Sequence, residues 1–192
     1  TLITDESNRR PVTVTRAKKT SVGYDINPSA GGLVTGMKGV YENLTMLWVG
    51  HSGIFANEAI FTNCAKDLTK QRLHAVPLSS QDYKRYYNGM SNSSIWPLFH
   101  YFPSAMRYET AYFEAYQRAN RVFADAVLEL CNDNDWIWVH DYHLMLLPGM
   151  LRKAKPDLKI AYFHHIPFPS SEIFRCLPHR EEMIAGLLGA DY

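Results

Sequence analysis

The sequence is poor in cysteine, carries almost no net charge and contains no long hydrophobic run. Its three cysteines, Cys64, Cys131 and Cys176, are widely spaced and form no CxxC motif, which argues for reduced thiols rather than a disulfide framework. The formal net charge of +1 provides no overall field that would attract nucleic acid or an anionic membrane. No apolar run reaches the roughly 18 residues of a membrane-spanning helix. We therefore expect a cytoplasmic protein with neither a nucleic-acid nor a membrane partner.

The sequence does contain a regular alternation of apolar strands and amphipathic helices. Hydrophobic residues make up 46% of the chain, which is enough for a well-buried core. The expected strands cover residues 45–49, 72–78, 136–139 and 158–163, and the expected helices cover residues 33–44, 79–87, 109–131, 143–153 and 180–188. This alternation predicts an α/β fold, a Rossmann-like parallel sheet with helices on both faces.

The chain shows no internal repeat, linker or low-complexity segment. We therefore predict a single domain over residues 1–192. The last residues, GLLGADY, resemble the end of a helix running into a new strand. For this reason we expect the domain to be incomplete.

Polar residues follow two of the expected strands at the point where each strand ends. Residues 140–143 read HDYH, and residues 164–167 read HHIP. In open parallel sheets the carboxyl ends of the strands line the ligand crevice, so we expect a polar site for a hydrogen-bonding ligand here. Asp141 either points into this crevice or caps the helix that begins at Tyr142. A histidine of the second cluster either donates a hydrogen bond to a ligand or is bonded to backbone in the core.

The spacing of His140 and His143 is one that a metal ion can use. A zinc site needs further ligands, and no cysteine or acidic cluster stands near in sequence to supply them. We therefore expect no metal site, and predict that one of these histidines is structural.

Three further features each have a functional and a structural interpretation. Gly31-Gly32 either lets backbone amides approach an anion at the start of a helix or forms a tight turn. Arg9 either clamps a phosphate at a strand end or, as its neighbours alone favour, is a surface charge. The aromatic residues around Tyr87 and Trp96 suit sugar rings and are equally common in cores. Stacking of single-stranded nucleic acid would need a basic groove, for which a near-neutral chain gives little support.

Taken together, these segments resemble the trehalose-phosphate synthase family, retaining glycosyltransferases with the two-domain GT-B architecture. The matching pieces occur in the family's order over nearly the whole chain, and the last two are the longest and most specific. They are residues 7–9 (SNR), 29–33 (SAGGL), 86–88 (YYN), 94–101 (SIWPLFHY), 138–143 (WVHDYH) and 165–174 (HIPFPSSEIF).

The resemblance implies transfer of glucose from a nucleotide sugar, with UDP-glucose as the expected donor, to glucose 6-phosphate. The product would be trehalose 6-phosphate, formed without a cofactor or metal. On the acceptor side, the resemblance implies that Arg9 and Tyr87 hold the phosphate. It also implies that Trp96 lines the acceptor site and that Asp141 bonds the acceptor hydroxyls.

On the donor side, the resemblance implies that His165 contacts the donor sugar at the reacting centre. Gly31 and Gly32 would lie against the donor phosphates. Asp141 and His165 are therefore the expected catalytic residues. In the family, most donor-binding residues lie in a C-terminal nucleotide-sugar domain that this chain lacks, so we expect these 192 residues alone to be inactive. We also allow for a homo-oligomer.

Two features depart from the family's pattern. His51 stands where the family commonly has a second tryptophan, which changes a wall near the acceptor. Asp5 and Glu6 precede Arg9 in a strand that is apolar in the family. These departures leave two alternatives open: another phosphorylated acceptor such as glycerol 3-phosphate, or a non-catalytic regulatory homologue.

Overall fold

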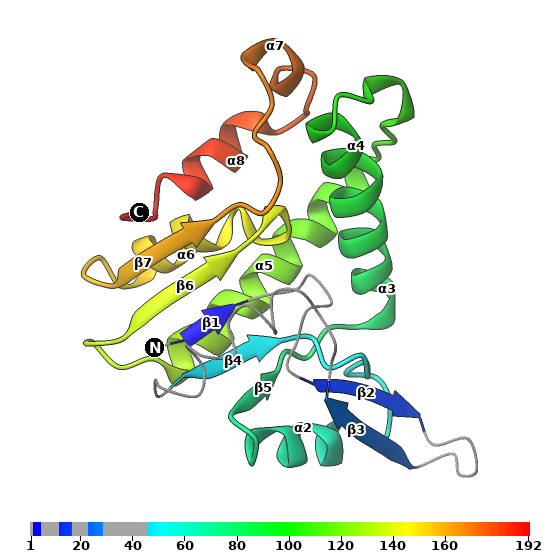
Figure 1. Cartoon of the computed structure of the whole chain (residues 1–192), viewed down its shortest axis with the longest axis vertical. Coiled ribbons are helices and arrows are strands. Elements are labelled where there is room, and N and C mark those ends of the chain that lie inside the picture. The colour runs from blue at the N-terminus through cyan, green and yellow to red at the C-terminus, as the bar shows by residue number, and fades with distance from the viewer. Residues whose placement is uncertain (1, 5–11, 17–22, 29–45) are drawn as a thin grey trace.

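A five-stranded parallel sheet forms the centre of the protein (Figure 1). The computed structural model describes residues 2–4, 12–16, 23–28 and 46–192. Within these residues the strand order is β5-β4-β1-β6-β7, and every neighbouring pair is parallel. The strands are β1 (Leu2–Thr4), β4 (Leu47–Gly50), β5 (Leu73–Ala75), β6 (Trp136–His140) and β7 (Lys159–Phe163).

The order of the strands reverses at β1, which lies in the middle of the sheet. The chain first builds β4 and β5 on one side of β1, and then β6 and β7 on the other side. In open α/β sheets such a reversal marks the crevice where ligands bind, at the carboxyl ends of the strands. The topology therefore places the ends of β4, β6 and β7 around one candidate crevice.

Helices cover both faces of the sheet, as the alternation predicts. Adjacent residues of β4 face opposite ways: Val49 belongs to one buried cluster and Trp48 to another. The first cluster includes the apolar stripe of α5 (Thr110–Leu130) and residues of α6 (Leu147–Ala154) and α8 (Arg180–Leu187). The second includes Cys64 and Leu68 of α2 (Phe61–Thr69). A sheet that is buried on both faces explains why its strands are continuous apolar runs.

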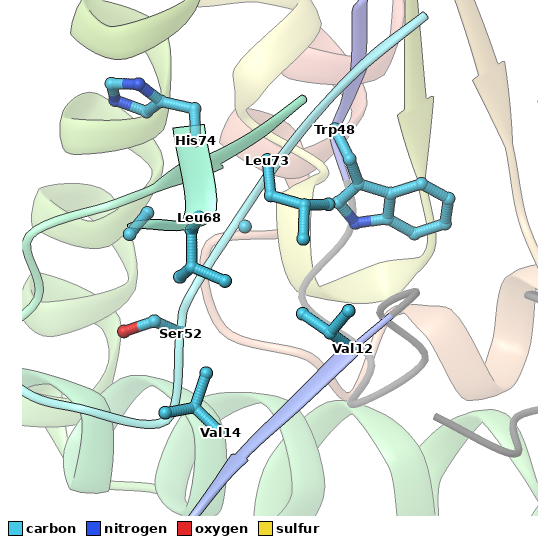
Figure 2. Close-up of a pocket in the computed structure, with 9 residues that line it drawn as sticks. Val12, Val14, Trp48, Ser52, Leu68, Leu73 and His74 are labelled. Atoms are coloured by element: carbon cyan, nitrogen blue, oxygen red, sulfur yellow. The ribbon is translucent and has the colours of Figure 1, made fainter. Parts of the chain in front are cut away.

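An antiparallel hairpin closes the second cluster at the β4–β5 side (Figure 1). It consists of β2 (Val12–Arg16) and β3 (Tyr24–Pro28), and the Tyr24 hydroxyl donates a hydrogen bond of 2.5 Å to Asp67 in α2. Figure 2 shows Val12 and Val14 of the hairpin facing Trp48, Leu68 and Leu73 across a cavity of about 10 Å³. This space holds no more than one water molecule, so it is a packing gap rather than a ligand site.

One long helical run was only partly predicted. The predicted helix 79–87 begins correctly, with the Ser79 side chain accepting a hydrogen bond from the Asp82 amide in α3 (Ser80–Tyr83). It then continues as the π-helix η1 (Lys84–Ile95) and ends in α4 (Trp96–Phe99). The run of asparagine, glycine and serine in residues 88–94 has low helix propensity, and π-helices of this length are rare. Sequence periodicity therefore underestimates this element.

Two further boundaries differ from the predictions by several residues, each next to a proline. Strand β5 ends at Ala75 rather than at residue 78, because Pro77 has no amide hydrogen to continue the ladder. Helix α6 begins at Leu147 rather than at residue 143, with Pro148 in its first turn after a 3₁₀ turn, η3 (Tyr142–Leu144). The predicted helix 33–44 lies outside the described residues.

Strand β3 was not predicted, and neither were the helical elements α2, η2 (Pro103–Ala105, a 3₁₀ turn) and α7 (Ser171–Phe174). None of the helices in the described part of the chain is long and apolar enough to cross a membrane.

Candidate active site

Asp141 forms the turn that follows β6. Its backbone has φ 70° and ψ 168°, a conformation that glycine adopts readily and that costs other residues on the order of 1–3 kcal/mol. The side chain is only 3% exposed. Its Oδ1 accepts hydrogen bonds from the amides of Tyr142 at 3.0 Å and His165 at 3.4 Å. The carboxylate thus caps the turn and also joins the end of β6 to the segment that follows β7.

Side chains of helix α5 hold this turn in place through hydrogen bonds. The buried Tyr116 hydroxyl donates to the carbonyl of Tyr142 at 2.7 Å and accepts from the amide of Met145 at 3.0 Å. The buried Asn120 amide donates to the carbonyl of His143 at 3.2 Å. Burial raises the pKa of Tyr116, so its hydroxyl keeps the proton that it donates. The strained turn at Asp141 is therefore held in place by side chains of α5.

Removing this support should destabilise the protein. We expect Tyr116→Phe to lower the free energy of unfolding by about 1–3 kcal/mol, because the Tyr142 carbonyl and the Met145 amide lose a buried partner. Chemical denaturation of both proteins measures this difference. As a matched control, Tyr112→Phe removes a hydroxyl that bonds the exposed Glu109, and should change the free energy of unfolding by less than about 0.5 kcal/mol. Equal losses in the two variants would contradict the supporting role.

A column of stacked rings crosses from the end of β6 to the end of β4. The ring of His143 stacks on Tyr87 with centroids 5.1 Å apart, and Tyr87 stacks on Tyr83 at 5.0 Å. Tyr83 in turn lies 4.6 Å from the ring of His51, which follows β4 and is 4% exposed. His143 Nδ1 is 3.9 Å from Asp141 Oδ2. The structure thus connects Tyr87 to Asp141 through His143, and connects His51 to Tyr87 through Tyr83.

His164 and His165 have different surroundings although they are neighbours in sequence. The Nε2 atom of His165 lies 3.0 Å from Nδ1 of His140, the last residue of β6. The ring of His164 lies next to Phe99, and its Nδ1 is 2.8 Å from the hydroxyl of Tyr162. Burial, with a smaller effect of His165, lowers the pKa of His164 to about 4. His164 is therefore a neutral, structural histidine at pH 7, and His165 is the one that faces the end of β6.

Trp96 lies at the junction of η1 and α4, on the same helical run as Tyr87. Its ring is 41% exposed and stacks on His100 with centroids 4.0 Å apart. The side chain of Trp96 is therefore available at the surface instead of forming part of the ring column.

The remaining predicted site residues, Arg9, Gly31 and Gly32, lie outside the described residues, as do Asp5 and Glu6. Their roles stay predictions. Across the part of the chain that the structure describes, no group of three or more histidine, cysteine, aspartate or glutamate side chains is arranged to hold a metal ion. The spacing of His140 and His143 suggested a metal. In the structure, His140 lies within hydrogen-bond distance of His165, and the ring of His143 stacks on Tyr87.

Sequence reasoning missed several side chains that build the site. Tyr83, Tyr116 and Asn120 contribute to the ring column or to the support of the turn, and none of the three was predicted to have such a role. Asn120 did leave a signal: it is a polar residue within the apolar stripe of α5, where it is fully buried. A buried amide needs hydrogen-bond partners, so its position indicates a polar contact from the helix to the rest of the fold.

The comparison with known families identifies the chain. Residues 4–192 match the profile of Glycosyltransferase family 20. The chain belongs to glycosyltransferase family 20. The predicted family and the predicted α/β fold of a GT-B enzyme are confirmed by this match and by the structural neighbours.

Curated relatives in the family are trehalose-phosphate synthases. The UDP-forming α,α-trehalose-phosphate synthase of Emericella nidulans is 46% identical over 191 residues, which cover 96% of this chain and 37% of the relative. The 56 kDa subunit of the UDP-forming enzyme of Saccharomyces cerevisiae is 43% identical over 192 residues, covering 96% of this chain and 38% of the relative. This family 20 chain therefore spans less than two fifths of the length of these two relatives.

Solved structures of trehalose-phosphate synthases resemble the fold of this chain. The UDP-forming α,α-trehalose-phosphate synthase of Burkholderia xenovorans in complex with glucose 6-phosphate has a TM-score of 0.75 and 27% identity, covering 99% of this chain and 38% of that one. An E. coli structure bound with UDP-2-fluoro glucose has a TM-score of 0.76 and 32% identity, covering 99% of this chain and 38% of that one. The family 20 fold is thus matched over essentially the whole of this chain.

Proposed function

We propose that this chain is the acceptor-side domain of an enzyme that transfers glucose from UDP-glucose to glucose 6-phosphate, forming trehalose 6-phosphate. The observation that carries the proposal is the placement of Asp141, His165 and Tyr87 together, at the carboxyl ends of β6 and β7 and beside η1. Ligands bind at this edge of open parallel sheets. Relatives named as UDP-forming synthases, one of them with bound glucose 6-phosphate, support these substrates.

In this proposal the site promotes transfer by holding the acceptor hydroxyl against the donor sugar in the reactive geometry. A transfer that retains configuration without a covalent intermediate needs the acceptor hydroxyl to attack on the face that the leaving group departs from. The departing phosphate gains charge and can take the proton of the attacking hydroxyl, so the protein needs to stabilise that charge rather than supply a base. Asp141 would orient the acceptor by bonding its hydroxyls, while His165 would contact the donor sugar.

Asp141 and His165 would not neutralise the charge of the donor phosphates. The donor phosphates carry charge that must be neutralised during transfer, and in the family the basic residues for this task lie in a C-terminal domain. We expect the isolated 192-residue chain to release no UDP from UDP-glucose above the rate without protein. Turnover by the isolated chain would contradict this division of the site.

The ring column makes Tyr83 a specific test of the acceptor side. Tyr83 stacks on Tyr87, and Tyr87 is proposed to hold the acceptor phosphate. An aromatic contact contributes about 0.5–1.5 kcal/mol, so Tyr83→Leu should raise KM for glucose 6-phosphate by about two- to tenfold. KM for UDP-glucose should stay the same, and Tyr83→Phe, which keeps the ring, should raise KM for glucose 6-phosphate less than Tyr83→Leu does. A shift of both KM values by the same factor would show that Tyr83 acts on the fold as a whole.

A second acceptor is favoured by one observation. His51 stands at the end of the ring column where the family commonly has a tryptophan, and a smaller ring changes the wall beside the acceptor. Its faces lie against Tyr83 and Phe55, with centroids 4.6 and 5.2 Å away. The imidazole is thus packed into the protein, and we retain glucose 6-phosphate as the first acceptor and glycerol 3-phosphate as the second.

Product analysis tests these assignments. The full-length protein that carries this chain is supplied with UDP-glucose and either glucose 6-phosphate or glycerol 3-phosphate, and the product is identified by proton NMR. We expect an α,α-linked disaccharide phosphate from glucose 6-phosphate. A product from glycerol 3-phosphate but none from glucose 6-phosphate would make glycerol 3-phosphate the acceptor. The absence of turnover with both acceptors, repeated with ADP-glucose and GDP-glucose, would favour a regulatory homologue.

A further inference from the structure

His140 and His165 form a hydrogen-bonded pair of imidazole rings. His140 ends β6 and its side chain is 1% exposed. Its Nδ1 lies 3.0 Å from Nε2 of His165, and the two ring planes differ by 18°. A separation of 3.0 Å between two nitrogens is within hydrogen-bond range. One proton must therefore lie between these two atoms.

The pairing restricts the chemical state of His165. A neutral imidazole has one nitrogen that donates and one that accepts. If His140 donates, the proton of His165 is on Nδ1; if His165 donates from Nε2, its Nδ1 has a lone pair. The two arrangements correspond to the two tautomers of His165, so the tautomer of His165 is coupled to that of His140. In either arrangement the ring of His165 cannot turn over without losing the bond. Unpaired histidine lacks both restrictions.

The rest of the structure holds the pair in a fixed geometry. His140 pairs with Phe163 in the ladder between β6 and β7, so the two strand ends cannot slide past each other. The amide of His165 donates to Oδ1 of Asp141, and the amide of Asp141 donates to the carbonyl of Phe163 at 2.7 Å. The backbone at both ends of the histidine pair is thus tied to rigid elements.

We propose that His140 is a positioning residue: it holds the ring of His165 in one orientation and determines which nitrogen of that ring carries the proton. The inference rests on the proposed function, in which His165 contacts the donor sugar. The tautomer of His165 matters there because a sugar hydroxyl bonds differently to an N–H group and to a lone pair. His140 itself is buried and acts through His165.

Two matched substitutions of the full-length protein test this role. His140→Phe keeps a flat ring and removes the nitrogen, whereas His140→Asn keeps a polar group near the place of Nδ1. We expect His140→Phe to lower kcat by roughly tenfold to a hundredfold, as for a misplaced reacting group, with KM for glucose 6-phosphate unchanged. His140→Asn should recover part of the lost kcat. Equal kcat in wild type and His140→Phe would overturn the proposal.

A spectroscopic measurement reads the tautomer directly. The protein is labelled with ¹⁵N-histidine, and the ring signals of His165 are assigned from their loss in His165→Gln. We expect the tautomer populations of His165 at neutral pH to differ between wild type and His140→Phe. Identical populations in the two proteins would overturn the proposal. Where His140→Phe does not fold, His140→Asn is compared with wild type in its place.

The two measurements separate this inference from the proposed function. If wild type transfers no glucose but the tautomer of His165 depends on His140, the proposed function fails and the positioning by His140 stands. If wild type is active and the tautomer does not depend on His140, the positioning fails and the proposed function stands.

Discussion

Replacing Asp141 with alanine is expected to lower kcat/KM for glucose 6-phosphate by at least about a hundredfold in the full-length protein. The buried carboxylate joins the ends of β6 and β7 through the amides of Tyr142 and His165. Alanine removes these bonds together with the group proposed to orient the acceptor. Initial rates with varied acceptor concentration measure the effect.

Two further variants separate the proposed catalytic role of Asp141 from its structural role. Asp141→Asn keeps an oxygen that can accept from both amides, and it leaves the backbone strain at this position unchanged. Asp141→Gly relieves the strain of φ 70°. We therefore expect melting temperatures to be higher for Asn and Gly than for Ala, while all three variants lose activity. A glycine variant that is stable and keeps wild-type activity would contradict the role of Asp141 in the reaction.

The stability of the protein should fall between about pH 6.5 and pH 4 because of His164. The pKa of this histidine is lowered from 6.5 to about 4 in the folded protein, mainly by burial. In this range the unfolded chain therefore binds a proton that the folded chain does not. The free energy of unfolding decreases as pH falls whenever the unfolded state binds more protons. Since each pKa unit corresponds to about 1.4 kcal/mol and the ring is partly exposed, we expect a loss on the order of 2 kcal/mol.

His164→Gln provides the test, because glutamine has no titration in this range. Urea denaturation at pH 7 and pH 4.5 gives the loss of stability on acidification for both proteins. The loss should be smaller in the variant, and the difference between the two proteins is the contribution of His164. Equal losses of stability on acidification in wild type and His164→Gln would contradict a histidine that stays neutral in the folded protein.

Much of the architecture could be predicted from the sequence because it depends on local patterns. Apolar runs such as residues 136–139 mark strands that are buried on both faces, and the stripe of residues 109–131 marks α5. The position of the site follows from the same patterns, since Asp141 and His165 each come after a strand and parallel strands end at one edge.

The details of the site depend on contacts between distant segments, which periodicity does not contain. The π-helix η1 brings Tyr87 onto His143, from residues more than fifty positions apart in sequence. The bond between His140 and His165 needs the exact register of β6 and β7. Sequence reasoning placed His140 at a strand end and in a metal-like spacing with His143, but it did not pair His140 with His165, because His165 comes from the segment after another strand.

The most direct test of the proposed function is the release of UDP from UDP-glucose by the full-length protein, measured with and without glucose 6-phosphate. A site that works by placing an acceptor hydroxyl against the donor sugar predicts release that depends on glucose 6-phosphate and saturates with it. Release at the same rate without an acceptor, or no release under either condition, would contradict a glucosyltransferase with its acceptor site at the ends of β6 and β7.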